Sequence, residues 1–225
     1  MNRLRALVRT PWFWGIVGIV LLLALNSIKD PTYLSIGINP TTGQLSGNVL
    51  DILRVSAPIV MIALGMTFVI ATSGIDLSVG SVMAVGGAIA MVALSGLNQP
   101  TSVGAMFAAI GLAVLLGVVL GAVNGFLVAV IGLQPFISTL VMMLAGRGIA
   151  RVITGGQNTN AENAPFRALA NGQFLGLPLS FVIAIVIVVL IALVMRRTAL
   201  GLMIESIGIN PQASRLAGVR SRGIV

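Results

Sequence analysis

Reactive side chains are scarce in this chain, whose 225 residues include no His and no Cys. Without these residue types there is no thiolate nucleophile, no Ser-His or Cys-His triad and no Cys/His zinc site. Five acidic residues remain, and Asp76 is the only one between Asp51 and Glu162. A carboxylate among apolar residues is costly at membrane depth and marks a functional site by default. Because His and Cys are absent, we expect no catalytic residue, metal or cofactor, and we rank a membrane-embedded enzyme last among the functional hypotheses.

Asp76 lies in a short polar stretch that allows two interpretations. Gly74 lets the chain turn, and Asp76 and Ser78 can accept hydrogen bonds from the free N–H groups of a helix that starts after them. On the first interpretation they form an N-cap at the cytoplasmic face. On the second they belong to a broken helix beside a permeation path.

Four further polar residues stand in or near apolar runs. Arg147 and Arg151 are four residues apart on one helical face, so they either snorkel to the membrane interface or line an external vestibule for a polar solute. Asn124 and Gln134 either join helices by hydrogen bonds or contact a substrate. The candidate substrate-pathway residues are thus Asp76, Asn124, Gln134, Arg147 and Arg151.

The composition places all of these residues in a membrane protein. Hydrophobic residues make up 57% of the chain and charged residues 8%, with a mean hydropathy of +1.09. A soluble domain carries about 25% charged residues, so a water-soluble globule, a disordered chain and a coiled coil are all excluded. The net charge of +8 fits the excess of Lys and Arg on cytoplasmic segments. No basic run with interleaved aromatic residues indicates a nucleic-acid partner.

The hydropathy pattern predicts an all-α, multi-pass membrane fold with six transmembrane helices. Charge-free or nearly charge-free runs separated by turn signals define the spans. An even number of crossings puts both Arg-rich ends in the cytoplasm, as the positive-inside rule favours. The predicted spans are residues 12–28, 55–72, 77–97, 103–131, 136–153 and 178–195.

Two longer connections, residues 29–54 and 154–177, read as external loops because they are polar and rich in turn residues. Pro58 then falls in the first turn of the second span, where its missing N–H has no helical partner anyway. An uncleaved signal anchor is expected for the first span, since Arg3, Arg5 and Arg9 precede it without a small-residue cleavage site behind it.

The fourth span carries small residues at every fourth position. Such residues let helix backbones approach closely in lipid. Either they form a packing seam within a mobile bundle or they serve plain helix packing, and on both interpretations this helix is interior. The residues are Ala105, Ala109, Ala113, Gly117, Gly121 and Gly125.

The last thirty residues, 196–225, are basic and broken by Gly and Pro. Ile209, Leu216 and Val219 form a possible apolar stripe, which suits docking of a short cytoplasmic helix into a partner's groove. The alternative is an interfacial helix that lies on anionic membrane lipid.

Three stretches resemble the ribose/xylose/galactofuranose-type sugar permeases of bacterial ABC importers. The strongest is GMTFVIATSGIDLSVGS at residues 65–81. The others run from residues 124–128 through 134–140 to 145–148, and from residues 198–201 through Glu205 to 217–219. Order and spacing agree over nearly the whole chain, with a leaning toward the galactofuranose-type branch.

The resemblance implies a permease subunit in the bacterial inner membrane that takes up a monosaccharide with energy from ATP. Its implied partners are a cytoplasmic ATP-binding subunit, a periplasmic sugar-binding protein and a second permease subunit, identical or paralogous. The segment that docks on the ATP-binding subunit would include Glu205, Gly208, Asn210, Ala217 and Gly218.

The chain departs from the family pattern in two respects. Pro211 and Ser214 stand where a regular, Ala-rich helix is expected, and the sequence stops at Val225, where a further hydrophobic span should begin. We therefore expect residues 1–225 to be a permease domain incomplete at its C-terminus, with residues 196–225 as its cytoplasmic coupling segment. The competing functional hypothesis is an ion-coupled secondary transporter or channel that uses a broken helix at Asp76.

Overall fold

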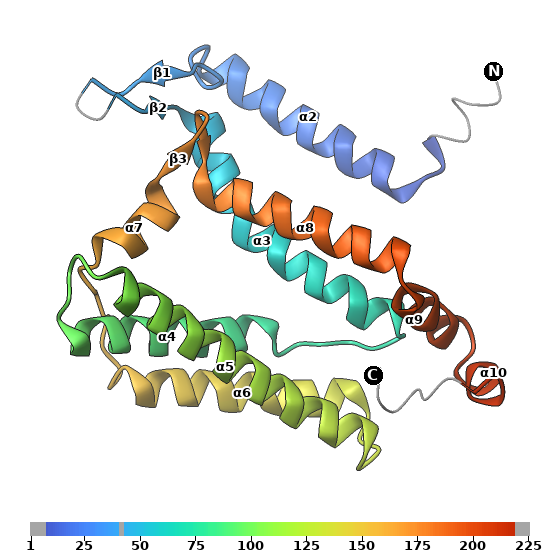
Figure 1. The fold of residues 1–225 in the computed structure, drawn as a ribbon. Coiled ribbons are helices and arrows are strands. Elements are labelled where there is room, and N and C mark those ends of the chain that lie inside the picture. Colours follow the sequence, from blue (N-terminus) through green and yellow to red (C-terminus); the bar gives the residue numbers. More distant parts are fainter. Residues whose placement is uncertain (1–7, 41–42, 219–225) are drawn as a thin grey trace.

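The computed structural model describes residues 8–40 and 43–218 and is built almost entirely of helices (Figure 1). Six of these helices are long and apolar enough to cross a membrane, which confirms the predicted number of spans and the all-α class. Arg3 and Arg5 lie outside the described residues. The six are α2 (Pro11–Lys29), α3 (Asn48–Ala71), α4 (Val79–Leu97), α5 (Val103–Ala129), α6 (Pro135–Ile153) and α8 (Leu179–Arg197).

The start of α3 differs most from the prediction. The helix begins at Asn48, so Asp51 and Arg54 lie inside it and form an ion pair of 2.9 Å at i,i+3 spacing. An acid in the first turn and an ion pair at this spacing both favour a helix, although the same charges had suggested a loop. Pro58 is therefore inside the helix, and the prediction that it lies in the first turn is wrong.

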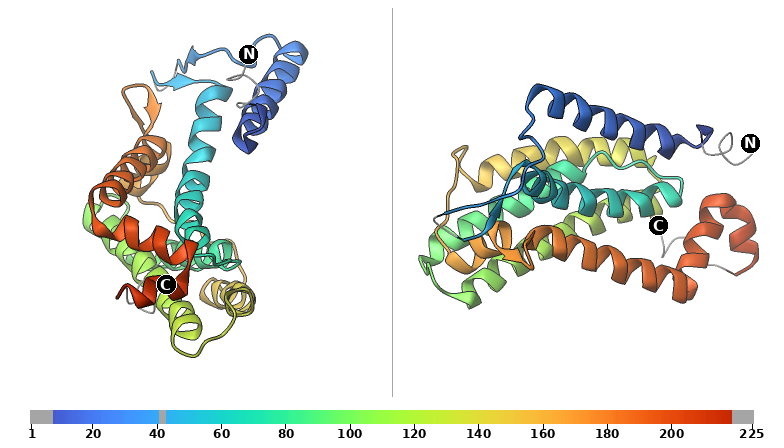
Figure 2. Two further views of the ribbon diagram at one scale, coloured as in Figure 1. Left: turned by 90° about the vertical axis from the view of Figure 1, so that its right-hand side faces the viewer. Right: turned by 90° about the horizontal axis from the view of Figure 1, so that it is seen from above.

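The helices form two groups, with α2 apart from both. One group consists of α4, α5 and α6, and the other of α3 and α8 together with the short α9 (Ala199–Ile209) and α10 (Pro211–Leu216). Figures 1 and 2 show the ribbon of α2 set apart from both groups. The two groups are joined by α7 (Ala164–Asn171), which contacts α5 and α8.

The helices run between two ends of the molecule. At the end we call the hairpin end, β1 (Gly37–Ile38) pairs with β2 (Leu45–Ser46), and β3 (Gln173–Phe174) pairs with β4 (Leu177–Pro178). At the opposite end, which we call the α9 end, α2 begins and α9 and α10 lie (Figure 1). The start of α2 and the basic C-terminal segment therefore lie at the same end of the molecule, as an even number of crossings requires.

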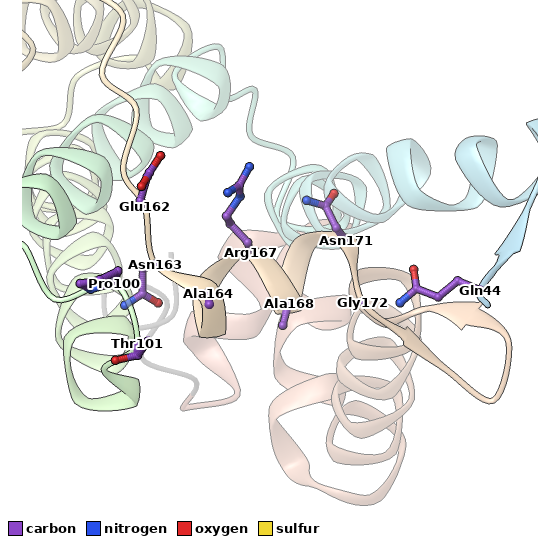
Figure 3. A pocket seen from close by; sticks show the side chains of 10 residues that line it. All are labelled: Gln44, Pro100, Thr101, Glu162, Asn163, Ala164, Arg167, Ala168, Asn171 and Gly172. Atoms are coloured by element: carbon purple, nitrogen blue, oxygen red, sulfur yellow. The ribbon is translucent and has the colours of Figure 1, made fainter. Parts of the chain in front are cut away.

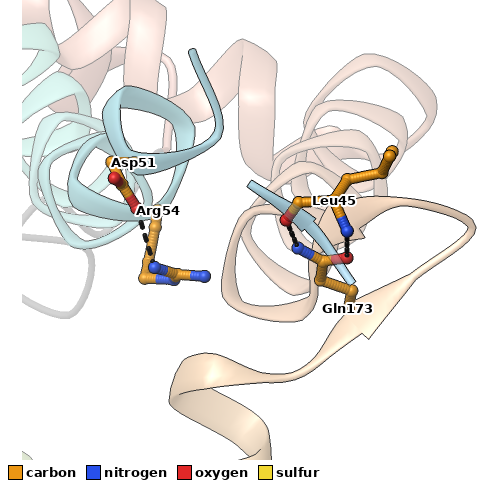
Figure 4. A network of polar contacts seen from close by, with 4 residues as sticks. All are labelled: Leu45, Asp51, Arg54 and Gln173. Carbon is orange, nitrogen blue, oxygen red and sulfur yellow. Dashed lines mark hydrogen bonds and ion pairs between the residues drawn. The ribbon is translucent and has the colours of Figure 1, made fainter. Parts of the chain in front are cut away.

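The two hairpins are tied together by one side chain. The amide of Gln173 accepts a hydrogen bond from the Leu45 N–H at 3.0 Å and donates one to the Leu45 carbonyl at 2.5 Å (Figure 4). This bidentate pair copies the hydrogen bonding of a strand across 128 residues of sequence. It fixes the connection before α3 against the connection before α8.

Small residues allow α4 and α5 to pack closely. Ala109 of α5 is fully buried in a cluster with Ala90 and Leu94 of α4. A Cβ built on Gly86 would lie 3.7 Å from Ala113, so the small-residue repeat of α5 does face a neighbouring helix. The opposite face of α5 is exposed in the described structure, for example at Val114. The prediction of an interior helix therefore holds for one face only.

A second close approach joins α4 to α6. Gly146 is buried, and a Cβ added there would lie 2.9 Å from both Cβ and Oγ of Ser81. The Ser81 hydroxyl donates to the carbonyl oxygens of Ser78 and Met142. The contact therefore needs glycine on α6 and a small side chain on α4.

Replacing Gly146 with Leu should destabilise the α4–α6 contact. The added side chain would overpack the interface, and we expect the free energy of unfolding to fall by about 1–3 kcal/mol. Unfolding by dodecyl sulfate in mixed micelles measures this change. The matched control is Gly148→Leu, because nothing lies within 4 Å of a Cβ added at Gly148. Equal losses in the two variants would contradict a close helix contact at Gly146.

Candidate functional site

The site begins where α3 ends. The Ser73 N–H donates to the Ile70 carbonyl at 2.9 Å and the Gly74 N–H to the Val69 carbonyl at 2.8 Å. This pair of bonds is the Schellman pattern, with Ser73 in the left-handed conformation at φ 62°. Ser73 takes the left-handed position, whereas the sequence had suggested that Gly74 makes the turn. The chain then runs without helix through residues 74–78 to α4.

This non-helical stretch, residues 74–78, is only partly covered by the helices, since Ile75 and Leu77 are exposed. Ser78 is 2% exposed. The Ile75 carbonyl accepts a hydrogen bond of 3.3 Å from the hydroxyl of Thr139, which belongs to the first turns of α6. Helix α4 thus begins beside the last turns of α5 and the first turns of α6. Irregular backbone at membrane depth is tolerated only where it is buried in protein or lines a cavity.

Asp76 closes a local turn in this stretch. One carboxylate oxygen accepts hydrogen bonds from the Ser78 N–H at 2.7 Å and from the Ser78 hydroxyl at 2.6 Å. Ser78 is the residue before α4, but its side chain makes no capping bond to the helix. The predicted two-residue N-cap is therefore replaced by an Asx turn, because the Ser78 hydroxyl is occupied by Asp76.

Asn124 connects this turn to two helices. Its Nδ2 donates to the Ser78 hydroxyl oxygen at 3.2 Å, and its Oδ1 accepts from the Ser138 hydroxyl at 2.8 Å. Asn124 is 8% exposed and Ser138 is 2% exposed. A buried chain of hydrogen bonds therefore runs from Asp76 through Ser78 and Asn124 to Ser138, joining the non-helical stretch to α5 and α6.

A cavity of about 340 Å³ opens beside this chain of hydrogen bonds. That volume lies in the range of small-molecule sites. Its lining includes the carboxylate residue Asp76, the amide residue Asn124 and the open faces of Gly121 and Gly125, the last members of the small-residue repeat. The remaining lining residues are Val69, Thr72, Gly74, Ile75, Ser78, Val79, Val82, Val128, Pro135 and Thr139.

The structure does not bring the other three candidate pathway residues to this cavity. Gln134 is exposed, precedes α6 and makes no side-chain capping bond. Arg147 and Arg151 are exposed along the part of α6 that leads to the hairpin end. Arg151 lines a separate hollow of about 350 Å³ together with residues of α4 such as Ala88. Of the five candidate residues, Asp76 and Asn124 therefore line this cavity, whereas Gln134, Arg147 and Arg151 lie elsewhere.

A larger polar hollow, which the sequence did not indicate, lies at the hairpin end. It measures about 540 Å³ and is lined by Glu162, Arg167, Asn171 and Gln44, among others (Figure 3). Asn163 is a buried lining residue, and its Nδ2 donates hydrogen bonds to the carbonyl oxygens of Gln99 and Ser102. The clustering of Glu, Asn and Arg in residues 154–177 was the available signal, but ordinary loop polarity has the same composition.

The candidate coupling residues fall on two short helices. Glu205 and Gly208 belong to α9, and Asn210 caps α10 by accepting from the N–H groups of Gln212 and Ala213 at 3.1 and 3.0 Å. Ala217 ends α10, and Gly218 follows at φ +88°.

Pro211 stands at the start of α10, where a helix does not use the N–H that proline lacks. Ser214 is buried, and its hydroxyl donates a hydrogen bond to the Asn210 carbonyl. Pro211 thus marks the helix break between α9 and α10, whereas Ser214 is accommodated inside α10. Val219, Arg220 and Arg222 lie outside the described residues.

The sequence is similar to permease proteins of bacterial sugar importers. It is 48% identical to the fructose import permease protein of Bifidobacterium longum, over 100% of this chain and 62% of that protein. It is 40% identical to the galactofuranose transporter permease protein of Escherichia coli, over 93% of this chain and 59% of that protein. Against the ribose import permease protein of Haemophilus influenzae the identity is 35%, over 90% and 59%.

The chain therefore spans about three fifths of the length of these relatives. A profile of the branched-chain amino acid transport system / permease component family matches residues 48–225. No solved structure gives a significant match. The identity to the fructose permease exceeds that to the galactofuranose permease, which does not favour the leaning toward the galactofuranose-type branch.

Replacing Asn124 with Ala should destabilise the fold because it leaves buried partners without hydrogen bonds. We expect a loss of about 1–3 kcal/mol in the free energy of unfolding. Because Asn124 and Ser138 share one bond, the Asn124→Ala/Ser138→Ala double variant should lose less than the sum of the single variants. Gln134→Ala is the control and should change stability by less than about 0.5 kcal/mol. Additive losses at Asn124 and Ser138 would argue against the buried chain of bonds.

Proposed function

The chain belongs to the branched-chain amino acid transport system / permease component family, and from this premise we propose that it is a permease subunit of an ATP-driven monosaccharide importer. The relatives that support this proposal are permease proteins named for fructose, galactofuranose and ribose. Each of these names is a monosaccharide, and the similarity extends over nine tenths or more of this chain. An ion-coupled secondary transporter has no such support.

The observation that carries the proposal is a largely apolar cavity with several polar side chains in its lining, at a helix break between apolar helices. Asp76 and Asn124 both line it, together with the hydroxyl-bearing residues Thr72, Ser78 and Thr139. A carboxylate accepts hydrogen bonds, and an amide donates and accepts them, so the pair suits the hydroxyl groups of a sugar. Broken helices beside polar cavities are a recurrent form of binding site in transporters.

We propose that the remaining candidate residues serve the same route. In this proposal Arg147 and Arg151, which are exposed on α6 apart from the cavity, serve the approach from the hairpin end, and the polar hollow around Arg167 is its entrance. Gln134 stands at the α9 end, at the inner exit. Passage from the hairpin end to the α9 end then meets polar groups before, within and after the cavity.

The proposed orientation places the α9 end in the cytoplasm of a bacterium and the molecule in its inner membrane. Among the described residues, this end carries Arg9, Arg196, Arg197 and Arg215 against the acids Glu205 and Asp76, an excess of positive charge that the positive-inside rule favours on the cytoplasmic side. Membrane lipid covers the exposed apolar faces of the helices, α2 in particular.

The proposed partners follow from this orientation. The ATP-binding subunit docks on α9 and α10 from the cytoplasm, through the surface that holds Glu205, Gly208, Asn210, Ala217 and Gly218. A periplasmic sugar-binding protein delivers the solute at the hairpin end. A second permease subunit, identical or paralogous, completes the pathway.

Uptake by proteoliposomes tests this proposal. The permease, purified with the ATP-binding subunit that copurifies with it, is reconstituted and supplied with radiolabelled fructose, ribose or galactofuranose on the side of the hairpin end. We expect accumulation of one of these sugars that depends on ATP hydrolysis and persists when ion gradients are collapsed. Accumulation that follows a proton or sodium gradient without ATP would instead identify a secondary transporter.

Replacing Asp76 with Asn should separate its local turn from its place in the pathway. Asn keeps an acceptor oxygen for both bonds from Ser78, so we expect the fold to be retained with a loss of about 1 kcal/mol in the free energy of unfolding. Loss of the charge should lower sugar uptake about tenfold or more, since hydrogen bonds to charged groups contribute about 1.5–3 kcal/mol. Asp51→Asn, at an exposed acid outside the cavity, is the control. Unchanged uptake by Asp76→Asn would leave Asp76 with the local turn alone.

A further inference from the structure

Ser73 occupies a backbone position that normally belongs to glycine. It is the left-handed residue of the Schellman pattern at the end of α3, with φ 62°. A residue with a Cβ is disfavoured in this conformation, and glycine is the usual choice. The serine therefore opposes the local turn, although Gly74 is the very next residue, and this indicates that its side chain has a use elsewhere.

The Ser73 hydroxyl reaches a helix that is 135 residues away in the sequence. It donates a hydrogen bond of 3.2 Å to the carbonyl oxygen of Gly208 in α9. The Gly208 backbone also packs directly on the end of α3, because a Cβ added at Gly208 would collide with the Ala71 carbonyl. Its neighbour Ile207 is 2% exposed. Helix α9 is therefore held against the last turn of α3 by a buried anchor, a backbone contact and this one hydrogen bond.

The same turn leads directly into the cavity. Thr72 and Gly74, on either side of Ser73, both line it, and Asp76 follows two residues later. Residues 74–78 have no helical bonds of their own to resist displacement. Their fixed points are Ser73 at one end and the bonds to Thr139 and Asn124 at the other.

We propose that Ser73 is a positioning residue that ties α9 to the non-helical stretch, so that a displacement of α9 moves Asp76 and changes the access to the cavity. The inference rests on the proposed function for its purpose, since α9 is the proposed contact of the ATP-binding subunit. It adds the route by which that contact reaches the cavity. Glycine at position 208 and serine at position 73 are both parts of this connection.

The chain contains no Cys, so a single reporter thiol can measure the cavity directly. We would introduce Val128→Cys, at a lining residue of the cavity on α5, and follow its reaction with a small charged methanethiosulfonate reagent in membrane vesicles. The rate is compared in the Ser73 parent, in Ser73→Gly and in Gly208→Ala. Glycine relieves the left-handed turn, so Ser73→Gly removes the bond to α9 without straining α3.

We expect Ser73→Gly and Gly208→Ala each to change the labelling rate by about fivefold or more, the lower end of the coupling usual between sites. Ser73→Asn, which tolerates the left-handed conformation and retains a donor, should restore the parent rate. Ser206→Ala is the matched control on α9, because the Ser206 hydroxyl donates to the Met203 carbonyl of its own helix. Rates equal to the parent in both Ser73→Gly and Gly208→Ala would overturn the inference, as would a failure of Ser73→Asn to restore the rate.

A second comparison separates this inference from the proposed function. In vesicles that also hold the ATP-binding subunit, adding ATP should change the labelling rate of the parent, and this change should be lost in Ser73→Gly while the subunit still copurifies. A Ser73→Gly variant that responds to ATP as the parent does would refute the positioning role. Absence of ATP-driven uptake by the parent counts against the proposed function alone, because the labelling rates without nucleotide still decide the role of Ser73.

Discussion

The need to satisfy backbone hydrogen bonds in an apolar medium governs the rest of this structure. Five residues, 74–78, leave the helical conformation beside α5 and α6, and an unpaired N–H or carbonyl group in an apolar medium is costly. Side chains replace the missing helical bonds: Asp76 accepts from the Ser78 N–H, and Thr139 donates to the Ile75 carbonyl. Helices α5 and α6 must therefore stand close to the break, and the polar groups that satisfy the backbone also face the cavity.

The small residues of α5 serve two purposes that depend on this break. Toward the hairpin end, Ala109 and Ala113 face α4 and let the two helices touch. Toward the α9 end, α4 has given way to the non-helical stretch, and Gly121 and Gly125 face the cavity. One repeat of small residues thus gives close packing where a helix stands opposite and open space where none does.

The sequence predicted the number and approximate limits of the spans because each span needs an apolar, nearly charge-free run long enough to cross the hydrocarbon core. It missed the start of α3, since Asp51 and Arg54 mark a loop by charge but stabilise a helix by pairing. It could not decide how Asp76 is used, because a turn and a cavity need the same residue types. Gln134, Arg147 and Arg151 lie in or beside predicted spans. Whether such a side chain points to a cavity or away from it depends on how the helices pack, which hydropathy does not encode. Ser73 drew no notice because only backbone geometry shows that glycine belongs there.

The position of the cavity explains why α9 can act on it. Its lining comes from both helix groups: Val69 and Thr72 belong to the α3 side, and Asn124 and Thr139 to the α4–α6 group. At the hairpin end α7 bridges the two groups by contacts with both α5 and α8. A relative movement of the groups therefore meets most resistance there and least at the α9 end, where the chain passes between them through the non-helical stretch. A force on α9 thus acts where the groups are most easily separated, and the side chains that it displaces first are those of the cavity.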